Sequence, residues 1–571
     1  MKRSFAVVMA LLMCFWFPSV SGAQTGNGHS KKPETVSKTN VPKITDVDGN
    51  KLFGLLESKL KQAGANEKLP VMIEFDPSFQ GKAVKALTKQ LGHFSVKYNY
   101  SVVDGIAATL TKSQIELLRL LPFVEEVQYD AKVVAFDASA NKWFGVTKAR
   151  RDFTLNGDLD GNVDSYSKED VVIAVIDTGI DDSHVDLDEG KVIGWKDFVN
   201  GKSEPYDDNG HGTHVSSIAT GEGDGNAAYK GVAPGAALVG VKVLNGQGSG
   251  SLSDVTAGIN WAVEHKDQYG IEVLSLSLGT TGCSDGTDMT SDAVNQAVEA
   301  GLTVTVAAGN AGPAECTVGS PGAAKKVISV GAGADLGQGG FFLAAFSSRG
   351  HTADGRIKPD IVSPGYKITA AKANSGDGYV TYSGTSMATP FTAGVAALML
   401  DANSSLTPSQ LKQDLYSTAV DWGPEGKDID YGYGRLDAYE AIEAAGGGSG
   451  TNIAVPDHFY TADSLPGSGY SDTYSFNVDN ADYPVAVTMI IPDWHATFAI
   501  FSEPDFDVYV YGPSGNMVAS SEGTERQETI SFDPAKTGTY RLEVSSYDGD
   551  GDYFFDLSAG VSSFEQTAND R

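Results

Sequence analysis

The chain has 571 residues, too many for one hydrophobic core, so several domains are expected. Its formal net charge is −31, because 73 Asp and Glu residues outnumber 42 Lys and Arg residues. This excess of acid argues against nucleic acid as a partner, since phosphate binding needs clustered Lys and Arg. It is consistent with a secreted protein in a salty or calcium-containing medium.

The N-terminus has the pattern of a secretion signal. A basic start at Lys2 and Arg3 precedes an apolar run over residues 5–17, and small residues follow up to Ala23. A membrane anchor is the alternative, but the run is too short to span a bilayer stably. The sequence therefore predicts a signal peptide over residues 1–23, export to the extracellular medium and no association with a membrane.

Residues 24–136 are predicted to form an N-terminal α+β domain behind a polar leader. Strand and helix patterns alternate from residue 51 onward, as expected for a small α+β sandwich. The predicted strands cover residues 71–75, 106–110 and 124–129, and the predicted helices cover residues 81–91 and 115–121.

Residues 137–445 have the pattern of a doubly wound α/β domain with a mostly parallel sheet. Apolar runs indicate strands that are buried on both faces, and helical stretches separate them. The predicted strands are residues 171–176, 237–243, 273–278, 303–307 and 327–330, and the predicted helices include residues 255–266 and 292–300.

The glycine-rich stretch 446–450 is predicted to be a flexible linker to a third domain. Residues 451–571 consist of short alternating runs separated by Gly, Pro and Asp turns, which indicates an all-β, jelly-roll-like sandwich. The predicted strands include residues 473–478, 486–491, 506–511 and 539–544.

The cysteines leave a single pairing. Cys14 is removed with the predicted signal peptide, so Cys283 and Cys316 are the only possible intramolecular pair. Two cysteines in an exported protein are more often bridged than free, and a disulfide is therefore expected. The alternative is two separate buried thiols.

An acidic loop has the spacing of a calcium site. Its oxygen ligands would be Asp158, Asp160, Asn162, Asp164 and Glu169. Alternate positions followed by a distant glutamate are close to an EF-hand loop. The pattern departs at Val163, where the sharp turn usually requires glycine, and Gly161 is expected to take over that turn. The alternative is an acidic surface loop without a metal.

Three separate segments carry residues suited to acyl transfer. Ser386 lies in a glycine-containing turn over residues 384–390, before an apolar helix whose positive end would face its hydroxyl. A serine needs an adjacent base to become a nucleophile. His211 offers that base, and Asp177 offers an acid at the end of the apolar run 171–176. The order Asp, His, Ser is one of the known orders of the acyl-transfer triad.

All three segments resemble those of the subtilisin-like serine proteases, the subtilases. The resemblance implies that Ser386 attacks a peptide carbonyl, His211 carries the proton and Asp177 orients the imidazole. It also implies that Asn310 and the backbone N–H of Ser386 form the oxyanion hole. Taken alone, Asp177 and Asn310 would each be interpreted as turn residues, and His214 is expected to be a structural histidine.

The resemblance also implies where substrate binds. The segment 276–279 resembles the family's edge segment, which pairs with an extended peptide backbone. The implied substrate-binding residues are Ser277, Leu278, Gly279, Ala308, Gly309 and Gly319. Ala311 stands where some family members carry an acidic residue, so a preference for apolar or aromatic P1 residues is expected. A Cys283–Cys316 bridge would join the loops beside this pocket.

The N-terminal domain resembles, more distantly, the subtilase propeptide, which assists folding and inhibits the enzyme. Counting forward from residues 124–129 places self-processing between Phe136 and Asp137. The alternative is an exposed tail open to any protease. The resemblance thus implies a zymogen whose partners are peptide substrates and its own propeptide. No pairing surface is evident in the sequence, so a monomer is expected.

Small jelly rolls appended to subtilases often bind calcium through acidic turns. The corresponding candidates here are Asp505, Asp507, Asp548 and Asp550. The same composition is also that of ordinary turns. Calcium is therefore expected as a structural cofactor, with these residues and the 158–169 loop as its ligands.

Three other functions fit parts of this sequence. An acid peptidase of the related class would carry Glu in place of His211. A catalytically inactive binding protein would have lost a triad residue, and none is missing. The C-terminal domain could instead be a wall- or carbohydrate-binding adhesin, with aromatic residues such as Trp494 and Tyr547 stacked on sugars.

Overall fold

The computed structural model describes residues 50–52, 54–64, 66–79, 82–99, 105–129, 139–162, 165–494 and 503–569. The predicted signal peptide, the predicted processing site at Phe136 and Asp137, and Asp164 lie outside these residues. Within the described chain, no helix combines the length and the apolar character needed to cross a membrane.

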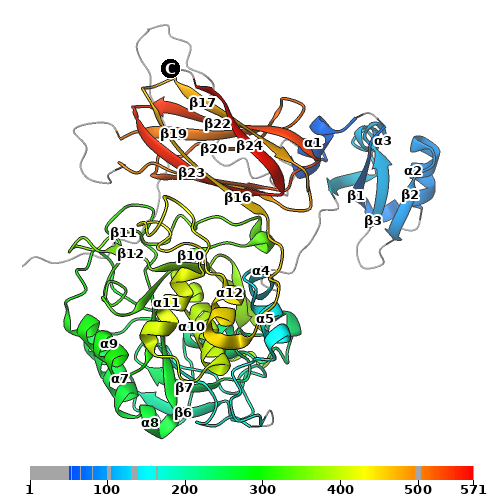
Figure 1. Ribbon diagram of the computed structural model, residues 1–571. Coiled ribbons are helices and arrows are strands. Elements are labelled where there is room, and N and C mark those ends of the chain that lie inside the picture. The colour runs from blue at the N-terminus through cyan, green and yellow to red at the C-terminus, as the bar shows by residue number, and fades with distance from the viewer. Residues whose placement is uncertain are drawn as a thin grey trace, which may run out of the picture. The chain divides into compact units, whose positions relative to one another are not determined.

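A parallel sheet forms the centre of the middle domain, and it confirms the predicted α/β class (Figure 1). Within residues 165–494 it has seven strands in the order β13-β10-β9-β8-β5-β7-β6, and every neighbouring pair is parallel. The strands are β5 (Val172–Asp177), β6 (Val192–Asp197), β7 (Ala237–Lys242), β8 (Ile271–Leu276), β9 (Thr303–Ala307), β10 (Ile328–Gly333) and β13 (Ile361–Pro364).

Strand β5 shows why these runs are apolar at every position. Ile173 and Val175 pack in a core on one face of the sheet, whereas Val172 and Ala174 pack in a second core on the other face. Helices α6 (His211–Thr220) and α10 (Thr385–Ala402) belong to the first core, and α7 (Leu252–Glu264) and α9 (Met289–Glu299) belong to the second. A strand covered on both faces is apolar along most of its length, and in β5 only the last residue, Asp177, is polar.

The remaining elements of the middle domain are short. The helices are α4 (Ala140–Trp143), α5 (Val146–Phe153), α8 (Lys266–Tyr269), α11 (Pro408–Ser417) and α12 (Ala438–Ile442). The strands β11 (Gly350–His351) and β12 (Ile357–Lys358) form one small antiparallel pair, and β14 (Ile368–Ala371) and β15 (Tyr379–Tyr382) form another.

The N-terminal domain has its own sheet and core. Among residues 50–129, the antiparallel order is β2-β3-β1-β4, with β1 (Lys68–Phe75), β2 (Ser95–Asn99), β3 (Gly105–Thr111) and β4 (Val124–Tyr129). The helices are α1 (Gly54–Gln62), α2 (Ala83–Leu91) and α3 (Lys112–Leu118). Helix α3 begins before the predicted residue 115, because Thr111 and Gln114 form a capping box at its start.

The C-terminal domain is a sandwich of two antiparallel sheets, as predicted. In the described part of this domain, the sheets have the orders β16-β23-β18-β21 and β20-β19-β22-β17-β24. The strands are β16 (Asp457–Leu465), β17 (Ser471–Val478), β18 (Val485–Ile490), β19 (Asp505–Tyr511), β20 (Met517–Ser521), β21 (Gln527–Phe532), β22 (Gly538–Asp548), β23 (Gly551–Ala559) and β24 (Val561–Asn569). Residues from both sheets share one hydrophobic core.

Candidate active site

Asp177 and His211 meet at the carboxyl end of strand β5. Asp177 is the last residue of β5 and is 1% exposed, and His211 is the first residue of α6. The Nδ1 atom of His211 lies 2.7 Å from Oδ1 of Asp177, and the same oxygen accepts the Thr178 N–H at 2.7 Å. The carboxylate therefore fixes the ring with Nδ1–H toward the acid and Nε2 free to act as a base.

Two glycines allow this close approach. A Cβ on Gly212 would lie 2.1 Å from the carbonyl oxygen of Gly179, and one on Gly179 would lie 2.1 Å from the carbonyl oxygen of Tyr206. Gly179 also has a φ of 123°, which disfavours other residues. A larger side chain at Gly212 would push the start of α6 away from the segment after β5, and one at Gly179 would push away the loop that leads into α6.

Asp207 organises the N-terminus of α6, although its role is not evident in the sequence. Its carboxylate is buried and accepts the backbone N–H groups of Gly210 at 2.8 Å and of Thr213 at 2.9 Å. It also accepts the hydroxyl of Thr178 at 3.0 Å, while the Gly212 N–H donates to that hydroxyl at 2.8 Å. The first turn of α6 is thus tied to the residue that follows Asp177.

The environments of His211 and His214 shift their pKa values in opposite directions. Burial lowers the pKa of His211, but the negative charge of Asp177 and the hydrogen bond to it raise that pKa by more, and the net direction is upward. His214 is fully buried and contacts the carbonyl oxygen of Val380 through Nε2 at 3.0 Å. Burial and the neighbouring His211 lower the pKa of His214 to about 3, so it stays neutral. This is the structural histidine expected from the sequence.

Ser386 is the second residue of α10 and faces the end of β8. Its hydroxyl donates to the carbonyl oxygen of Ser277 at 3.2 Å, and the Ser277 hydroxyl donates to the carbonyl oxygen of Ser386 at 2.7 Å. In the described chain, no hydrogen bond joins Ser386 to His211. Catalytic hydrogen bonds are often long in substrate-free structures and tighten only when substrate binds.

Asn310 is held by Thr385, a residue that the sequence did not single out. The backbone N–H and the hydroxyl of Thr385 donate to Oδ1 of Asn310 at 2.9 and 3.1 Å. The same hydroxyl accepts the Gly309 N–H at 3.2 Å. Because both contacts require an acceptor on Asn310, its amide nitrogen must point the other way, where it can donate to an anion.

The expected substrate-binding residues lie in three segments, the third of which contains Gly319. Ser277, Leu278 and Gly279 follow β8 directly, and Ala308 and Gly309 follow β9. The first segment is joined to the 318–320 segment by hydrogen bonds from the Thr280 N–H to Ser320 and from the Ser284 N–H to Val318, at 2.8 and 3.0 Å. A Cβ on Gly319 would lie 1.9 Å from the Thr280 carbonyl oxygen, so only glycine fits there.

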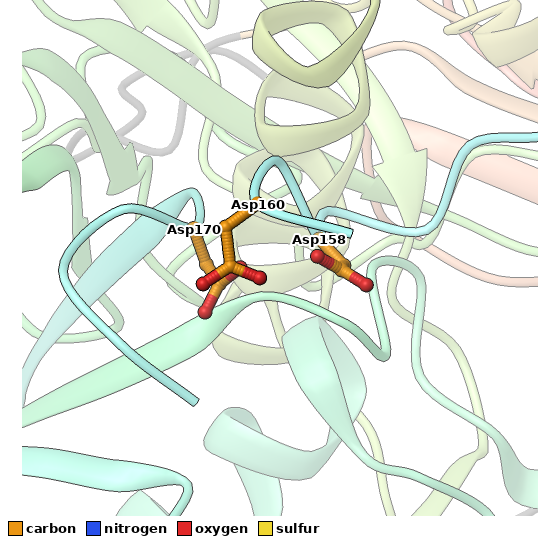
Figure 2. Close-up of side chains that lie close together, drawn as sticks. All are labelled: Asp158, Asp160 and Asp170. Carbon is orange, nitrogen blue, oxygen red and sulfur yellow. The ribbon is translucent and has the colours of Figure 1, made fainter. Parts of the chain in front are cut away.

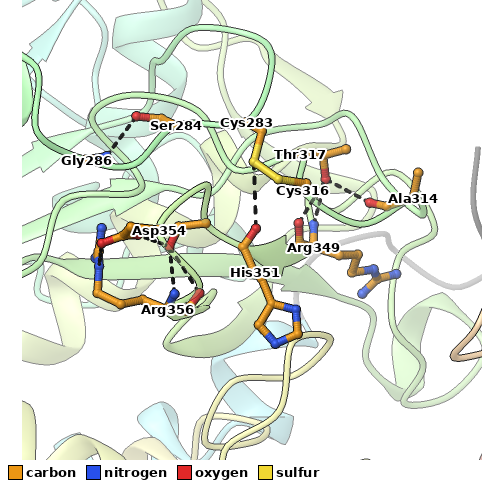
Figure 3. Close-up of a disulfide and its surroundings, with 11 residues drawn as sticks. Cys283, Ser284, Gly286, Ala314, Cys316, Thr317, Arg349, His351, Asp354 and Arg356 are labelled. Atoms are coloured by element: carbon orange, nitrogen blue, oxygen red, sulfur yellow. Dashed lines mark hydrogen bonds and ion pairs between the residues drawn. A yellow bond between two sulfur atoms is a disulfide. The ribbon is translucent and has the colours of Figure 1, made fainter. Parts of the chain in front are cut away.

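A disulfide joins the 280–284 stretch to the 316–320 stretch in the predicted pairing (Figure 3). Cys283 and Cys316 are 33 positions apart, and their Cα atoms are 4.8 Å apart. Arg356 adds a second tie, because its guanidinium donates to the carbonyl oxygens of Asp285 at 2.6 Å and Ala323 at 2.8 Å.

The predicted metal ligands fall in two places. Asp158 and Asp160 lie close together with Asp170, whereas Glu169 is exposed beside Lys168. The amide nitrogen of Asn162 donates to the hydroxyl of Ser165 at 2.7 Å.

The predicted metal ligands of the C-terminal domain lie on and beside two neighbouring strands, β19 and β22. Asp505 and Asp548 face each other across β19 and β22. Burial is the main cause that raises the pKa of Asp507 to about 6. The charges of Asp505 and Glu522 act in the same direction, and a hydrogen bond from Tyr509 opposes them. Among the described residues, Asp505, Asp507, Asp548 and Asp550 do not form a group of three ligands within reach of one ion.

Comparison with known proteins adds to this geometry. The chain is 37% identical over 420 residues to the serine protease AprX of Bacillus subtilis (strain 168), a match that covers 68% of this chain and 91% of that protein. The chain belongs to the subtilase family. Residues 168–434 match that family and contain all four residues of the predicted catalytic set, and residues 470–546 match the bacterial pre-peptidase C-terminal domain.

Other subtilases are similar over different lengths. The thermophilic serine proteinase of Bacillus sp. (strain AK1) is 32% identical over 456 residues, which cover 77% of this chain and 97% of that protein. Subtilisin DY of Bacillus licheniformis is 37% identical over 280 residues, which cover 49% of this chain and 93% of that protein. Among solved structures, Sphericase matches with 33% identity and a TM-score of 0.42, over 52% of this chain and 98% of that one. The protein is thus a serine endopeptidase of the subtilase family.

Proposed function

We propose that this subtilase cleaves peptide bonds with Ser386 as the nucleophile. The Ser386 oxygen attacks the substrate carbonyl carbon while its proton passes to Nε2 of His211, and the Asp177 carboxylate stabilises the imidazolium that forms. His211 then gives the proton to the leaving amine. Water repeats the sequence on the acyl-enzyme, and Ser386 is regenerated.

The observation that carries this proposal is the 2.7 Å contact between Asp177 and His211 at the carboxyl end of β5. Functional groups of open α/β sheets gather at this edge, and an oriented imidazole is what a serine nucleophile requires. The amide nitrogen of Asn310 and the Ser386 N–H supply donors for the oxyanion, and Thr385 supports the amide orientation that this role needs.

We further propose that the enzyme prefers apolar or aromatic P1 residues. The expected pocket residues Gly279, Ala308, Gly309 and Gly319 carry no charge and little side-chain volume. A set of peptides that differ only at P1 tests this preference. Higher kcat/KM for Phe, Tyr and Leu than for Lys, Arg and Asp is the expected result, and a profile led by Lys or Arg would contradict it.

The enzyme is proposed to be secreted as a self-processing zymogen that works as a monomer. The basic and apolar N-terminus supports export, and the separate core of residues 50–129 supports an N-terminal domain that folds beside the enzyme and inhibits it. Cleavage between Phe136 and Asp137 would release this domain. Subtilases generally bind calcium, and we propose that calcium is a structural cofactor of this chain too.

The test compares the purified parent with Ser386→Ala in calcium-containing buffer. Casein hydrolysis and the N-terminal sequence of each protein are measured together. The matched control is Ser405→Ala, which removes an exposed hydroxyl beyond the far end of α10. We expect the parent and the control to hydrolyse casein and to begin near Asp137, whereas Ser386→Ala stays inactive and unprocessed.

Two results would contradict parts of this proposal. If Ser386→Ala keeps measurable casein hydrolysis, Ser386 is not the nucleophile. If Ser386→Ala is inactive but still begins at Asp137, the chain does not process itself, and another protease activates it.

A further inference from the structure

Three carboxylates meet in the loop between α5 and β5. Asp158, Asp160 and Asp170 each offer an oxygen atom, and these atoms all lie within 4.8 Å of one another. Figure 2 shows the three side chains close together. Asp170 lies just before the first residue of β5, Val172. Gly161 has a φ of 75°, which turns the chain sharply after Asp160.

Asp170 provides the independent sign that a cation belongs here. It is 2% exposed, and its Oδ1 atom is buried without a hydrogen-bond partner in the described chain. Its other oxygen accepts the Ser167 N–H at 2.7 Å. An ionised carboxylate that is buried and half unpaired is costly unless a counter-ion balances it.

Within the described residues no ion pair supplies that counter-ion. Lys191 is near enough for the charge of Asp170 to act on it, but its ammonium group pairs with Glu222 at 3.4 Å. No Lys or Arg forms an ion pair with any of the three aspartates in the described residues, and the adjacent Lys168 lies beside Glu169 at 3.9 Å. Burial raises the pKa of Asp170. The charges of Asp160 and Asp158 act in the same direction, and the hydrogen bond from Ser167 opposes them. The three groups thus repel one another when all are ionised.

The neighbouring space is rich in oxygen atoms. A cavity of about 190 Å³ opens beside Asp158. Its lining includes Asn156, Asn162, Ser165, Glu222, Asp224 and Lys230. Calcium takes six to eight oxygen ligands at flexible angles and fills its remaining positions with amide oxygens and water. Magnesium requires a stricter octahedron, so this loose, highly charged set favours calcium.

We propose that Asp158, Asp160 and Asp170 bind one calcium ion, and that the ion fastens the 157–162 turn to the start of β5. Glu169, the ligand that loop spacing suggests, takes no part. The site lies at the end of β5 opposite to Asp177, and the six residues of this strand span about 17 Å. Its effect should therefore fall on stability and not on the chemical step.

The contacts of the turn explain how an ion here would stabilise the domain. The Val171 N–H donates to the Gly157 carbonyl oxygen at 3.1 Å, directly after Asp170. The N–H groups of Asn156 and Gly157 both donate to Asp401, in the last turn of α10, at 2.9 and 2.8 Å. Calcium would hold together the segment that links the sheet to the far end of this buried helix.

The experiment uses the full chain with Ser386→Ala, which prevents self-digestion. Calcium binding is measured by calorimetry after removal of metal, and Tm is measured with and without calcium. The test variants are Asp160→Asn, at an exposed position, and Asp170→Asn. The matched control is Glu169→Gln, which removes a neighbouring carboxylate whose side chain is 60% exposed.

We expect both test variants to bind one calcium ion fewer than the parent, and Glu169→Gln to match the parent. Asp170→Asn has a further signature, because it removes a buried charge. Without calcium its Tm should equal or exceed that of the parent, and with calcium the parent should become the more stable protein. Parent-like calcium binding by both Asp160→Asn and Asp170→Asn, or loss of an ion in Glu169→Gln, overturns the proposal.

Discussion

Ser277 and Ser386 exchange two hydrogen bonds, and the second of them replaces a bond that α10 cannot make. In a regular helix, the N–H of residue 390 would donate to the carbonyl oxygen of Ser386. Pro390 has no N–H, and the Ser277 hydroxyl donates to that oxygen at 2.7 Å instead. The proline thus leaves an acceptor beside the nucleophile that a residue of the substrate-binding segment satisfies.

Ser277→Ala should therefore destabilise the protein through the carbonyl oxygen of Ser386. Leaving a fully buried acceptor unpaired costs about 1–3 kcal/mol of unfolding free energy, and this partly buried oxygen should fall toward the lower end of that range. Pro390→Ala restores an N–H donor within the helix, so the cost of Ser277→Ala should shrink in that background. Urea unfolding of the four proteins of this cycle, all with Ser386→Ala, measures the coupling. Equal costs in both backgrounds would show that the Ser277 hydroxyl does not substitute for the missing helix bond.

Asn310 should act on kcat and leave KM nearly unchanged. Its amide nitrogen is placed to meet a charge that exists only in the transition state, and loss of one such donor costs about 10²–10³-fold in rate. Steady-state kinetics of Asn310→Ala with a chromogenic peptide provide the measurement. An increase in KM with constant kcat would instead assign Asn310 to ground-state binding.

Thr385→Val should reproduce part of that defect without touching the donor itself. The variant keeps the backbone N–H that binds Asn310 but loses the hydroxyl that contacts both Asn310 and Gly309. We expect a smaller fall in kcat than in Asn310→Ala. Thr389→Val is the matched control, because in the described part of the chain its buried hydroxyl donates only to the Thr385 carbonyl oxygen within α10. Equal effects of the two valine substitutions would point to helix stability and not to amide orientation.

The acid limb of the pH profile should report His211. Its neutral form is the base, so kcat/KM falls as the pH drops through its pKa. Burial lowers that pKa and Asp177 raises it by more, which places the limb above the ordinary value of about 6.5. Asp177→Asn removes the raising charge, and the limb should move to lower pH while kcat falls by up to about 10⁴-fold. An unchanged limb in Asp177→Asn would assign it to another group.

The interaction of His211 with Asp177 also contributes to stability in a way that depends on pH. Because the folded pKa of His211 is above its unfolded value, the stabilisation is fully present below about pH 6.5 and is lost as the pH rises through the folded pKa. In the Ser386→Ala background, the stability lost through Asp177→Asn should therefore become smaller as the pH increases. Thermal unfolding of both proteins from pH 5 to 9 measures this loss, and a loss that grows with pH would contradict the assignment.

The strands and residues that could be predicted from the sequence have a recognisable pattern in their own stretch of the chain. Strands that are buried on both faces are mostly apolar, so the runs at β5, β7, β8, β9 and β10 were recognisable. β6 and β13 were not, because β6 is a half-exposed edge strand with Gly194 and Lys196 inside it, and β13 has only four residues. Asp177, His211 and Ser386 were predicted from the motifs around them.

Residues that act through tertiary contacts escaped prediction. Thr385 meets Asn310 across 75 positions of sequence, and nothing near either residue announces the contact. The acidic loop over residues 158–170 gives a second example. Loop spacing selected Glu169, but the Ser167 N–H holds the Asp170 carboxylate inward at 2.7 Å and Glu169 remains at the surface. The shift by one position that we propose for the ligand is smaller than loop spacing can resolve.

The Cys283–Cys316 disulfide should support both stability and substrate binding. Closing a loop of this length stabilises a protein by about 3–4 kcal/mol in the chain-entropy estimate. The two segments stay joined through Thr280, Ser284 and Arg356, so Cys283→Ser with Cys316→Ser should fold with a lower Tm. Looser segments beside the expected pocket should raise KM by a few-fold and leave kcat nearly constant. Reduction of the parent with dithiothreitol should reproduce both changes and leave the double variant unaffected. A double variant with the parent's Tm and KM would show that the hydrogen bonds and Arg356 suffice to hold these loops.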